Sequence, residues 1–217
     1  PPARDTGLIA QTSYLYTVSA YDNAGNESAQ SFPLNVVTAD CPVGELQWSK
    51  RFGGSSRDIG VDVAADVSDN ILITGTCIGT ADFGGGPLTS AGSKDIFVAK
   101  YTPSGNHLWS KRFGGINDEN VESIAVDGAG DVVVSGSFTG ATNLGGATLT
   151  ASGLRDIFVA KYSGVDGIHL WSKRFGDAGD DIGYDVAVAS NGDVVMTGSF
   201  TDAVDFGGGA LISAFGG

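Results

Sequence analysis

The side chains of this sequence that could bind a ligand or a cation are acidic residues, which occupy equivalent positions of a repeated pattern. One set is Asp58, Glu119 and Asp181, and a second set is Asp62 and Asp185, with Ser123 in the middle copy. If the loops that carry them meet around a channel, the carboxylates could hold Ca²⁺, a hard cation that takes about six to eight oxygen ligands. They could equally accept hydrogen bonds from backbone N–H groups of a neighbouring repeat. Both interpretations stay open; no other metal and no cofactor is expected.

The acidic residues follow three copies of the hexapeptide WSKRFG, at 48–53, 109–114 and 171–176. The copies are about 61 residues apart, and a fixed period of this kind indicates a repeat architecture. Residues 95–101 and 156–162 are also identical, with the sequence DIFVAKY. The repeat predicts the following units: an outer strand 46–53, complete copies 54–114 and 115–176, and a half copy 177–217.

Each copy holds four strand-like runs, which in the second copy are 123–127, 131–137, 156–162 and 169–175. The runs are apolar on both alternating faces, so each sheet should be covered on both sides. Four antiparallel strands per copy predict an all-β fold of β-propeller blades. Closed propellers have about four to eight blades, so the ring should be incomplete here and its open faces should promote association.

The two stretches GYDVAVASNGDVVMTGSF and DIFVAKYSGVDGIHLWSKRFG resemble the bacterial SBBP-type β-propeller repeat, across residues 46–217. This resemblance implies an extracellular or cell-surface location in a bacterial protein. Residues 1–40 are similar to the C-terminal end of a fibronectin type III β-sandwich, in which Tyr14 would form the tyrosine corner. Two strands cannot make a sandwich, so that domain should be partial, with 41–45 as a linker. The start at Pro1 without Met leads us to expect an internal segment.

The recurrent tryptophans and basic pairs have structural interpretations. Trp48, Trp109 and Trp171 should fill the gap between an outer strand and the neighbouring copy, although an aromatic ring can also stack on sugar. The Lys-Arg pairs should be solvated charge that protects an exposed sheet edge, with anion binding as the alternative. Cys41 and Cys77 allow one disulfide at most, and the sequence leaves their pairing open.

The length and net charge of the chain limit the classes of binding partner. The chain has 217 residues and a formal net charge of −13, which disfavours nucleic acid and anionic membranes. No apolar run is long enough for membrane insertion. The two histidines, His107 and His169, are equivalent positions beside a packing tryptophan, and no catalytic motif occurs.

We therefore expect a non-enzymatic binding or scaffolding module that serves adhesion or ligand display, with an unknown protein or glycan ligand. The alternative is an accessory module of a larger secreted hydrolase whose catalytic domain lies elsewhere. A propeller enzyme would need one copy whose loops break the repeat, and no copy present does so.

Overall fold

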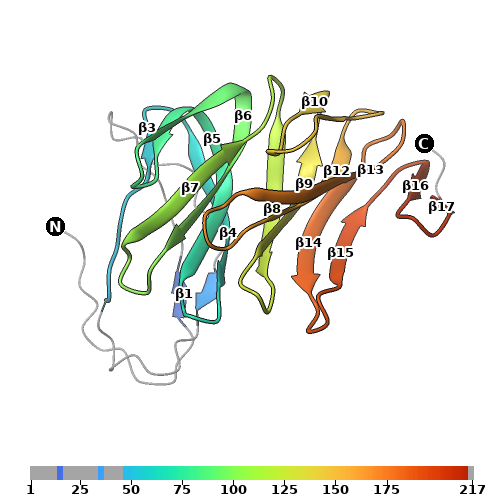
Figure 1. Cartoon of the computed structure of the whole chain (residues 1–217). Coiled ribbons are helices and arrows are strands. Elements are labelled where there is room, and N and C mark those ends of the chain that lie inside the picture. The colour runs from blue at the N-terminus through green and yellow to red at the C-terminus, as the bar shows by residue number, and fades with distance from the viewer. Residues whose placement is uncertain (1–13, 17–33, 37–45, 215–217) are drawn as a thin grey trace.

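The computed structural model describes residues 14–16, 34–36 and 46–214, and strands with their turns make up this part of the chain (Figure 1). No helix occurs among the described residues, so none of them forms a helix that could cross a membrane. The all-β prediction is confirmed. Near the N-terminus, β1 (Tyr14–Tyr16) pairs antiparallel with β2 (Leu34–Val36). The Tyr14 side chain, the rest of the fibronectin-like segment and the linker 41–45 lie outside the described residues.

The first sheet follows the predicted order of four runs. It contains β4 (Asp58–Ala65), β5 (Ile71–Asp82), β6 (Pro87–Tyr101) and β7 (His107–Phe113), each antiparallel to the next. The short strand β3 (Gly53–Gly54) pairs with the far end of β5. The β5–β6 hairpin is longer than the sequence predicts, because the Gly-rich loop after Asp82 continues the pairing beyond a register shift near Gly79.

The second sheet is four-stranded, and its order across the sheet is the order along the chain. Its strands are β8 (Glu119–Val126), β9 (Val132–Phe138), β12 (Asp156–Tyr162) and β13 (His169–Phe175). The hairpin of β10 (Ala141–Thr142) and β11 (Leu149–Thr150) lies between β9 and β12 in sequence. In the half copy, β14 (Ile182–Val188) pairs with β15 (Val194–Ser199), and β16 (Ala203–Asp205) pairs with β17 (Ala210–Ile212).

The copies repeat in backbone conformation as well as in sequence. At one turn the first two copies have Gly79 with a φ of 69° and Gly140 with a φ of 60°. The third copy has Asp202 there, with a φ of 61°. Asp is among the few residues besides glycine that adopt this left-handed conformation readily. The third copy therefore keeps the turn conformation although aspartate replaces glycine there.

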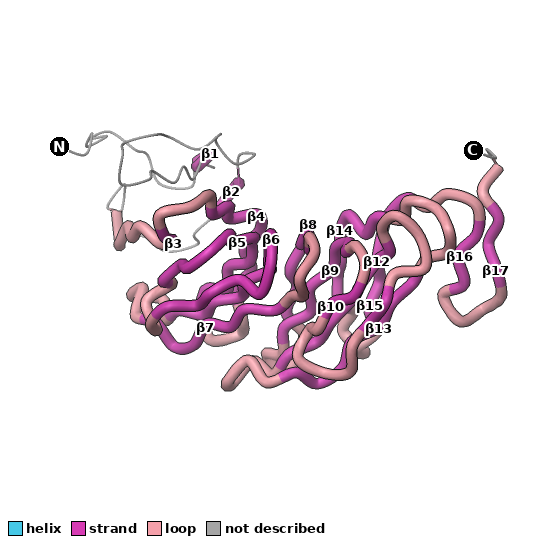
Figure 2. The backbone as a smooth tube through the Cα atoms, turned by 90° about the horizontal axis from the view of Figure 1, so that it is seen from above, coloured by secondary structure: helices cyan, strands magenta, loops and turns pink. Residues whose placement is uncertain are grey.

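The three sheets lie side by side in an open row, and the described residues do not close into a ring (Figures 1 and 2). Alternate side chains of β9 pack on opposite faces of the second sheet. Val132 and Val134 are in the cluster shared with the first sheet, whereas Val133 is in the cluster shared with β14 and β15. Both faces of the second sheet are covered, as the continuous apolar runs predict.

Candidate functional site

The contacts between consecutive sheets gather most of the recurrent polar residues, and we call each such contact a seam. The first seam joins the sheet β4–β7 to the sheet β8–β13, and the second seam joins the latter sheet to β14–β15. At the first seam, the Nε1 of Trp109 donates to the carbonyl of Gly164, 3.2 Å away in the turn between β12 and β13. Trp48 makes the same contact with Pro103, at 2.9 Å, in the turn between β6 and β7. These positions fit the packing interpretation of the tryptophans.

Glycines in the two receiving turns make room for the indole rings. Gly167 has a φ of 70°, and a Cβ added to it would lie 2.8 Å from Cε3 of Trp109. Gly105 has a φ of 78°, and a Cβ there would lie 2.6 Å from Cδ2 of Trp48. Both turns thus need glycine for conformation and for close approach.

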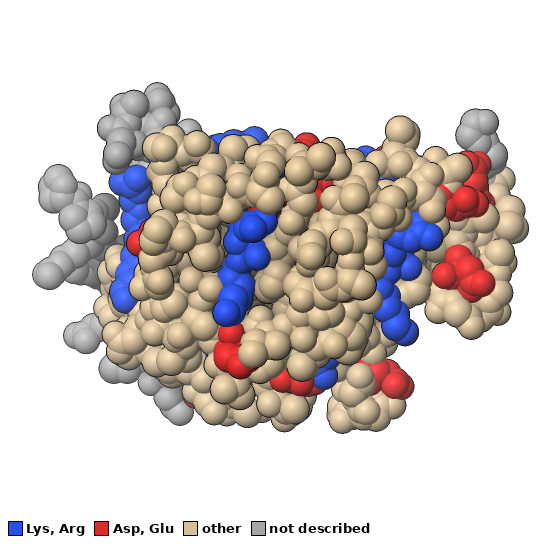
Figure 3. All heavy atoms as spheres, turned by 45° about the horizontal axis from the view of Figure 1, so that its top comes forward, with Lys and Arg blue, Asp and Glu red and all other residues tan. Residues whose placement is uncertain are grey.

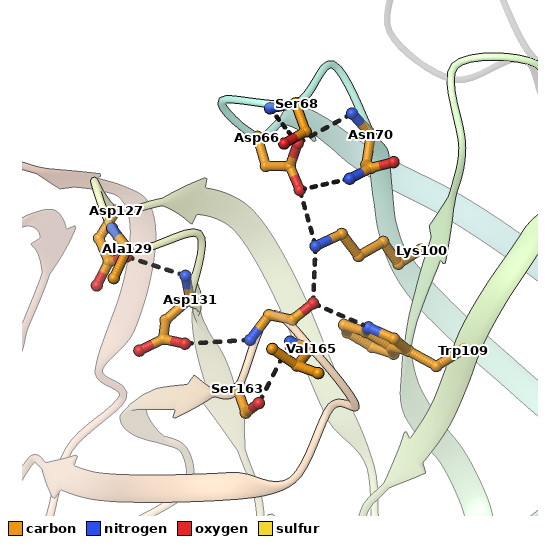
Figure 4. Close-up of polar contacts among 11 residues, drawn as sticks. Asp66, Ser68, Asn70, Lys100, Trp109, Asp127, Ala129, Asp131, Ser163 and Val165 are labelled. Carbon is orange, nitrogen blue, oxygen red and sulfur yellow. Dashed lines mark hydrogen bonds and ion pairs between the residues drawn. The ribbon is translucent and has the colours of Figure 1, made fainter.

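The Gly164 carbonyl receives a second donor from the first sheet (Figure 4). Nζ of Lys100 lies 2.7 Å from this carbonyl and 2.8 Å from Oδ2 of Asp66, and the Lys100 side chain is only 8% exposed. Burial alone would raise the pKa of Asp66, but the ammonium of Lys100 and three hydrogen bonds from Ser68 and Asn70 lower it well below its ordinary value. The charged Lys100 therefore links the two sheets across the seam from among the buried apolar residues at the end of β6.

The basic pairs are not simply solvated edge charge, so that interpretation is corrected in part. Nη1 of Arg112 lies 2.6 Å from Oδ2 of Asp95, whose side chain is 0% exposed. Arg174 forms the equivalent ion pair with the buried Asp156. A buried carboxylate needs a partner charge, which explains the arginine in each complete copy. Arg51, in the first hexapeptide, is exposed.

The basic side chains form separate narrow stripes, one per copy, and no continuous patch is visible on this face (Figure 3). The sequence distributes them in this way because each hexapeptide contributes one pair. Lys50 donates to the carbonyl of Gly105, whereas Lys173 is exposed. In the first hexapeptide the lysine of the pair thus contacts the turn between β6 and β7.

The first acidic set is buried. Asp58 is 8% exposed, and Glu119 and Asp181 are both 0% exposed. The backbone N–H of Gly54 donates to Asp58 at 2.7 Å, and that of Asp177 donates to Asp181 at 3.0 Å. Burial raises the pKa of Asp58 and Asp181, and these hydrogen bonds lower it in part.

Glu119 differs from its two aspartate counterparts. Its pKa is raised to about 7, mainly by burial and also by the charge of Asp95, while the nearby Gly115 N–H and Thr142 hydroxyl act in the opposite direction. Neither Glu119 oxygen has a hydrogen bond of full geometry, and one oxygen of Asp95 also lacks one. At the first seam, the Glu119 carboxyl group thus lies near another buried carboxylate, that of Asp95.

The second acidic set ties the innermost strands of neighbouring sheets. Oδ2 of Asp62 accepts from the backbone N–H of Ile124 at 2.8 Å, and Oδ1 of Asp185 accepts from the Ser123 hydroxyl at 2.7 Å. A β-bulge precedes Asp62 and another precedes Asp185, and a bulge changes the direction in which the following side chain points. Asp62 thus accepts a backbone N–H of the neighbouring repeat, which is one of the two alternatives that the sequence left open, whereas Asp185 accepts a side-chain hydroxyl.

The structure does not gather the five acidic residues into one ring. The carboxylate that raises the pKa of Glu119 most is Asp95, and the one that raises the pKa of Asp181 most is Asp156, so these two members of the set interact with different carboxylates at different seams. Within 46–214 and the two short N-terminal strands, no group of three or more His, Cys, Asp or Glu side chains is placed to hold a metal.

The histidines belong to the packing of each copy. Nε2 of His107 lies 3.0 Å from Oγ of Ser110, and His169 has the same relation to Ser172. Each imidazole also lies edge-on to a buried tyrosine, Tyr101 or Tyr162. Burial lowers the pKa of His169.

Cys77 is a free buried thiol, and burial together with the charges of Asp58 and Asp95 raises its pKa to about 12. Cys41 lies outside the described residues. Sequence reasoning missed the roles of Asp95, Asp156 and Lys100. The available signal was the identical heptapeptide DIFVAKY, because a strand that keeps two charged residues among buried apolar ones must pair them.

An all-β chain of tandem antiparallel sheets, open at both ends and joined by recurring contacts, is consistent with a module of propeller repeats. Residues 47–84 match a family described as the SBBP β-propeller repeat. An uncharacterised WD repeat-containing protein of Acanthamoeba polyphaga mimivirus is 28% identical over 213 residues, covering 78% of this chain and 15% of the relative. Exoglucanase B of Cellulomonas fimi is 46% identical over 61 residues, covering 24% of this chain and 6% of the relative. The chain thus spans a small part of the length of the relatives it matches.

Proposed function

We propose that this chain is a non-enzymatic binding or scaffolding module of a secreted or cell-surface bacterial protein, serving adhesion or ligand display. In this proposal a fibronectin type III segment precedes propeller blades, the ligand is a protein or glycan, and neither nucleic acid nor membrane insertion is involved. The observation that carries this proposal is that the recurrent side chains make contacts inside the protein. Trp109, Lys100, Arg112 and Asp62 each make a contact within or between sheets, which leaves the loops to meet a ligand.

One hollow of the surface supports a ligand-binding role. A cavity of about 550 Å³ is lined by Lys50, Arg51, Phe52, Gly53, Asp82 and Gly84. Its lining combines one aromatic ring with three charged side chains, which suits a polar ligand such as a glycan. Screening the chain against immobilised glycans and candidate surface proteins tests the proposal. Binding that Arg51→Ala together with Asp82→Ala abolishes would support it, and a screen without any hit would count against it.

Ca²⁺ is a further candidate ligand of the acidic loops, with Asp58, Glu119, Asp181, Asp62 and Asp185 as the residues concerned. Calorimetric titration with Ca²⁺ tests it directly. Measurable heat with a raised melting temperature would support a cation role. Absence of both would end it, and the module would then need no metal.

The second candidate is an accessory module of a larger secreted hydrolase. The observation that favours it is the 61-residue match at 46% identity to a protein named Exoglucanase B. Reading the full-length gene discriminates between the two. A catalytic domain in the same polypeptide favours the accessory role, whereas further repeats with a surface anchor favour the display role.

A further inference from the structure

The first strand of each copy carries a β-bulge at the same position of the repeat, in β4, β8 and β14. The bulged residues are Val61, Glu122 and Tyr184, and the strand register leaves each of them without a partner on the next strand. Tyr184 is 52% exposed, and Val61 and Glu122 are exposed as well. A bulged residue stands outside the regular ladder. This position therefore presents a different side chain to solvent in each copy: aliphatic, acidic and aromatic.

Two hydrogen bonds hold β4, β8 and β14 beside one another. Oδ2 of Asp62 on β4 accepts from the N–H of Ile124 on β8, and the Ser123 hydroxyl on β8 donates to Asp185 on β14. Both bonds join residues 62 positions apart. Asp62, Ser123 and Asp185 each follow directly on a bulged residue. The bulges of neighbouring strands are therefore aligned, and β8 has a neighbour on both sides.

Two basic side chains at equivalent positions of the first two copies flank Glu122. Lys94 donates to Oδ1 of Asn120, which lies two residues before Glu122 on β8. Arg155 makes a bidentate ion pair with Asp180, in which Nε lies 2.6 Å from Oδ1 and Nη2 lies 2.5 Å from Oδ2. Burial raises the pKa of Glu122, and the charges of Lys94 and Arg155 oppose that rise. Both cations are thus close enough to act on this carboxylate.

Tyr184 belongs to the same cluster of side chains. Its hydroxyl lies 2.9 Å from Oγ of Ser199 on β15, which holds the phenol ring from one side. The pKa of Arg155 is raised mainly by its hydrogen bond to Asp180, and Tyr184 and Glu122 raise it further. Arg155 therefore lies near both bulged residues, and an aromatic ring and a carboxylate are placed around one guanidinium.

We propose that Tyr184, Glu122, Lys94 and Arg155 together bind a neutral glycan. This inference rests on the proposed function and names the side chains that meet the ligand. The exposed phenol ring offers an apolar face on which a sugar ring can stack. Glu122 accepts hydrogen bonds from sugar hydroxyls, and an ammonium and a guanidinium each carry more N–H donors than their present contacts use.

The charges of the cluster decide for a neutral ligand. The positive charges of Lys94 and Arg155 are balanced by the negative charges of Glu122 and Asp180. A surface without net charge gives no electrostatic preference to an acidic or a basic ligand, because specificity follows charge complementarity. The cluster therefore suits a sugar whose groups are hydroxyls.

Calorimetric titration of the whole chain tests this inference. The probes are cellotetraose, maltotetraose and mannotetraose as neutral oligosaccharides, with sialyllactose as an acidic probe and a glucosamine tetramer as a basic one. At least one neutral probe should bind, and more tightly than the charged probes. Tyr184→Ala should weaken that binding about tenfold or more, and Glu122→Gln about three- to tenfold. Tyr184→Phe keeps the ring and should keep most of the affinity. The control Val67→Ala, at an 81% exposed position in another turn, should leave it unchanged.

A reversed charge gives the argument a second readout. Glu122→Lys leaves the cluster with a net positive charge, so its preference should shift from the neutral probe toward sialyllactose. The urea unfolding midpoints of these variants should match the parent's, because the replaced side chains are exposed. Unchanged sialyllactose binding by Glu122→Lys would contradict the charge argument.

Two further results would overturn the inference, and each treats the proposed function differently. If no neutral probe binds, the glycan site is wrong, and the proposed function then depends on a protein ligand found in its own screen. If a glycan binds but Tyr184→Ala and Glu122→Gln leave the affinity intact, while Arg51→Ala with Asp82→Ala abolishes it, the hollow described above is the site. The proposed function would then stand without this inference.

Discussion

The indole nitrogen of Trp109 is hydrogen-bonded to the carbonyl of Gly164, and Trp48 is bonded to Pro103 over the same sequence separation of 55 residues. One donor thus reaches from the outer strand of a sheet to the last turn of the next sheet. Because the separation is the same in both copies, the repeat period of the sequence places each of these two tryptophans in the same position relative to the turn that accepts its hydrogen bond. The tryptophans of the first two hexapeptides thus both contact the turn of the following sheet.

Replacing Trp109 by Ala should destabilise the chain by about 3–5 kcal/mol, since the ring is 7% exposed and its loss leaves a cavity. Trp109→Phe should cost less, mainly through loss of the hydrogen bond. The matched control is Trp171→Ala, whose ring is more exposed and lacks the turn contact. Urea unfolding followed by far-ultraviolet circular dichroism measures all three. Equal losses at Trp109 and Trp171 would contradict the seam role.

Gly167→Ala should destabilise the chain by at least about 1–2 kcal/mol, because it adds a positive-φ strain and a contact with the Trp109 ring. Gly128→Ala is the control, because a Cβ at that turn position meets no atom within 4 Å and its φ is not in the left-handed region. Thermal melts of the two variants give the comparison. A stable Gly167→Ala variant would show that the turn can move away from the indole.

Arg112→Ala should cost about 3–5 kcal/mol, because it leaves the fully buried Asp95 without its partner charge. Arg51→Ala, at the equivalent exposed position of the first hexapeptide, should change stability by less than about 0.5 kcal/mol. Denaturant titration at neutral pH measures both. If the two variants behave alike, edge charge would account for the arginines after all.

Glu119→Gln should stabilise the chain in a pH-dependent way. The pKa of Glu119 is about 7 in the folded chain against an ordinary value of 4.5, so the folded state holds a proton that the unfolded state releases between these values. Stability from this group is present below pH 4.5 and is lost as the pH rises through 7, by up to about 3 kcal/mol. The glutamine variant should therefore match the parent at pH 4 and exceed it at pH 8.

Urea titrations at the two pH values test this expectation. Asp118→Asn, at the exposed neighbour whose charge makes the smallest contribution to the raised pKa of Glu119, should show a much weaker dependence. A difference between Glu119→Gln and the parent that stays constant with pH would mean that the carboxyl is ionised throughout.

Much of the fold could be predicted because its signals are local. Alternating apolar residues, hairpin turns and the repeated hexapeptide gave the strand runs of each copy, and β8, β9, β12 and β13 lie where those runs predict. The burial of Glu119 could not be predicted in this way. Its surroundings, Asp95 and Thr142, come from two different sheets, and no local pattern reports on them.

The sequence by itself determined the period, the strand order and the residue types at each seam, since these depend on neighbours along the chain. Only the tertiary structure decided which partner each polar side chain has. Asp62 accepts the backbone N–H of Ile124 on the neighbouring sheet, and Arg112, which could have been solvated, pairs with Asp95. The physical reason is desolvation: a polar group that becomes buried when strands and sheets pack is stabilised by a partner, and for these residues the partner comes from another strand or another sheet.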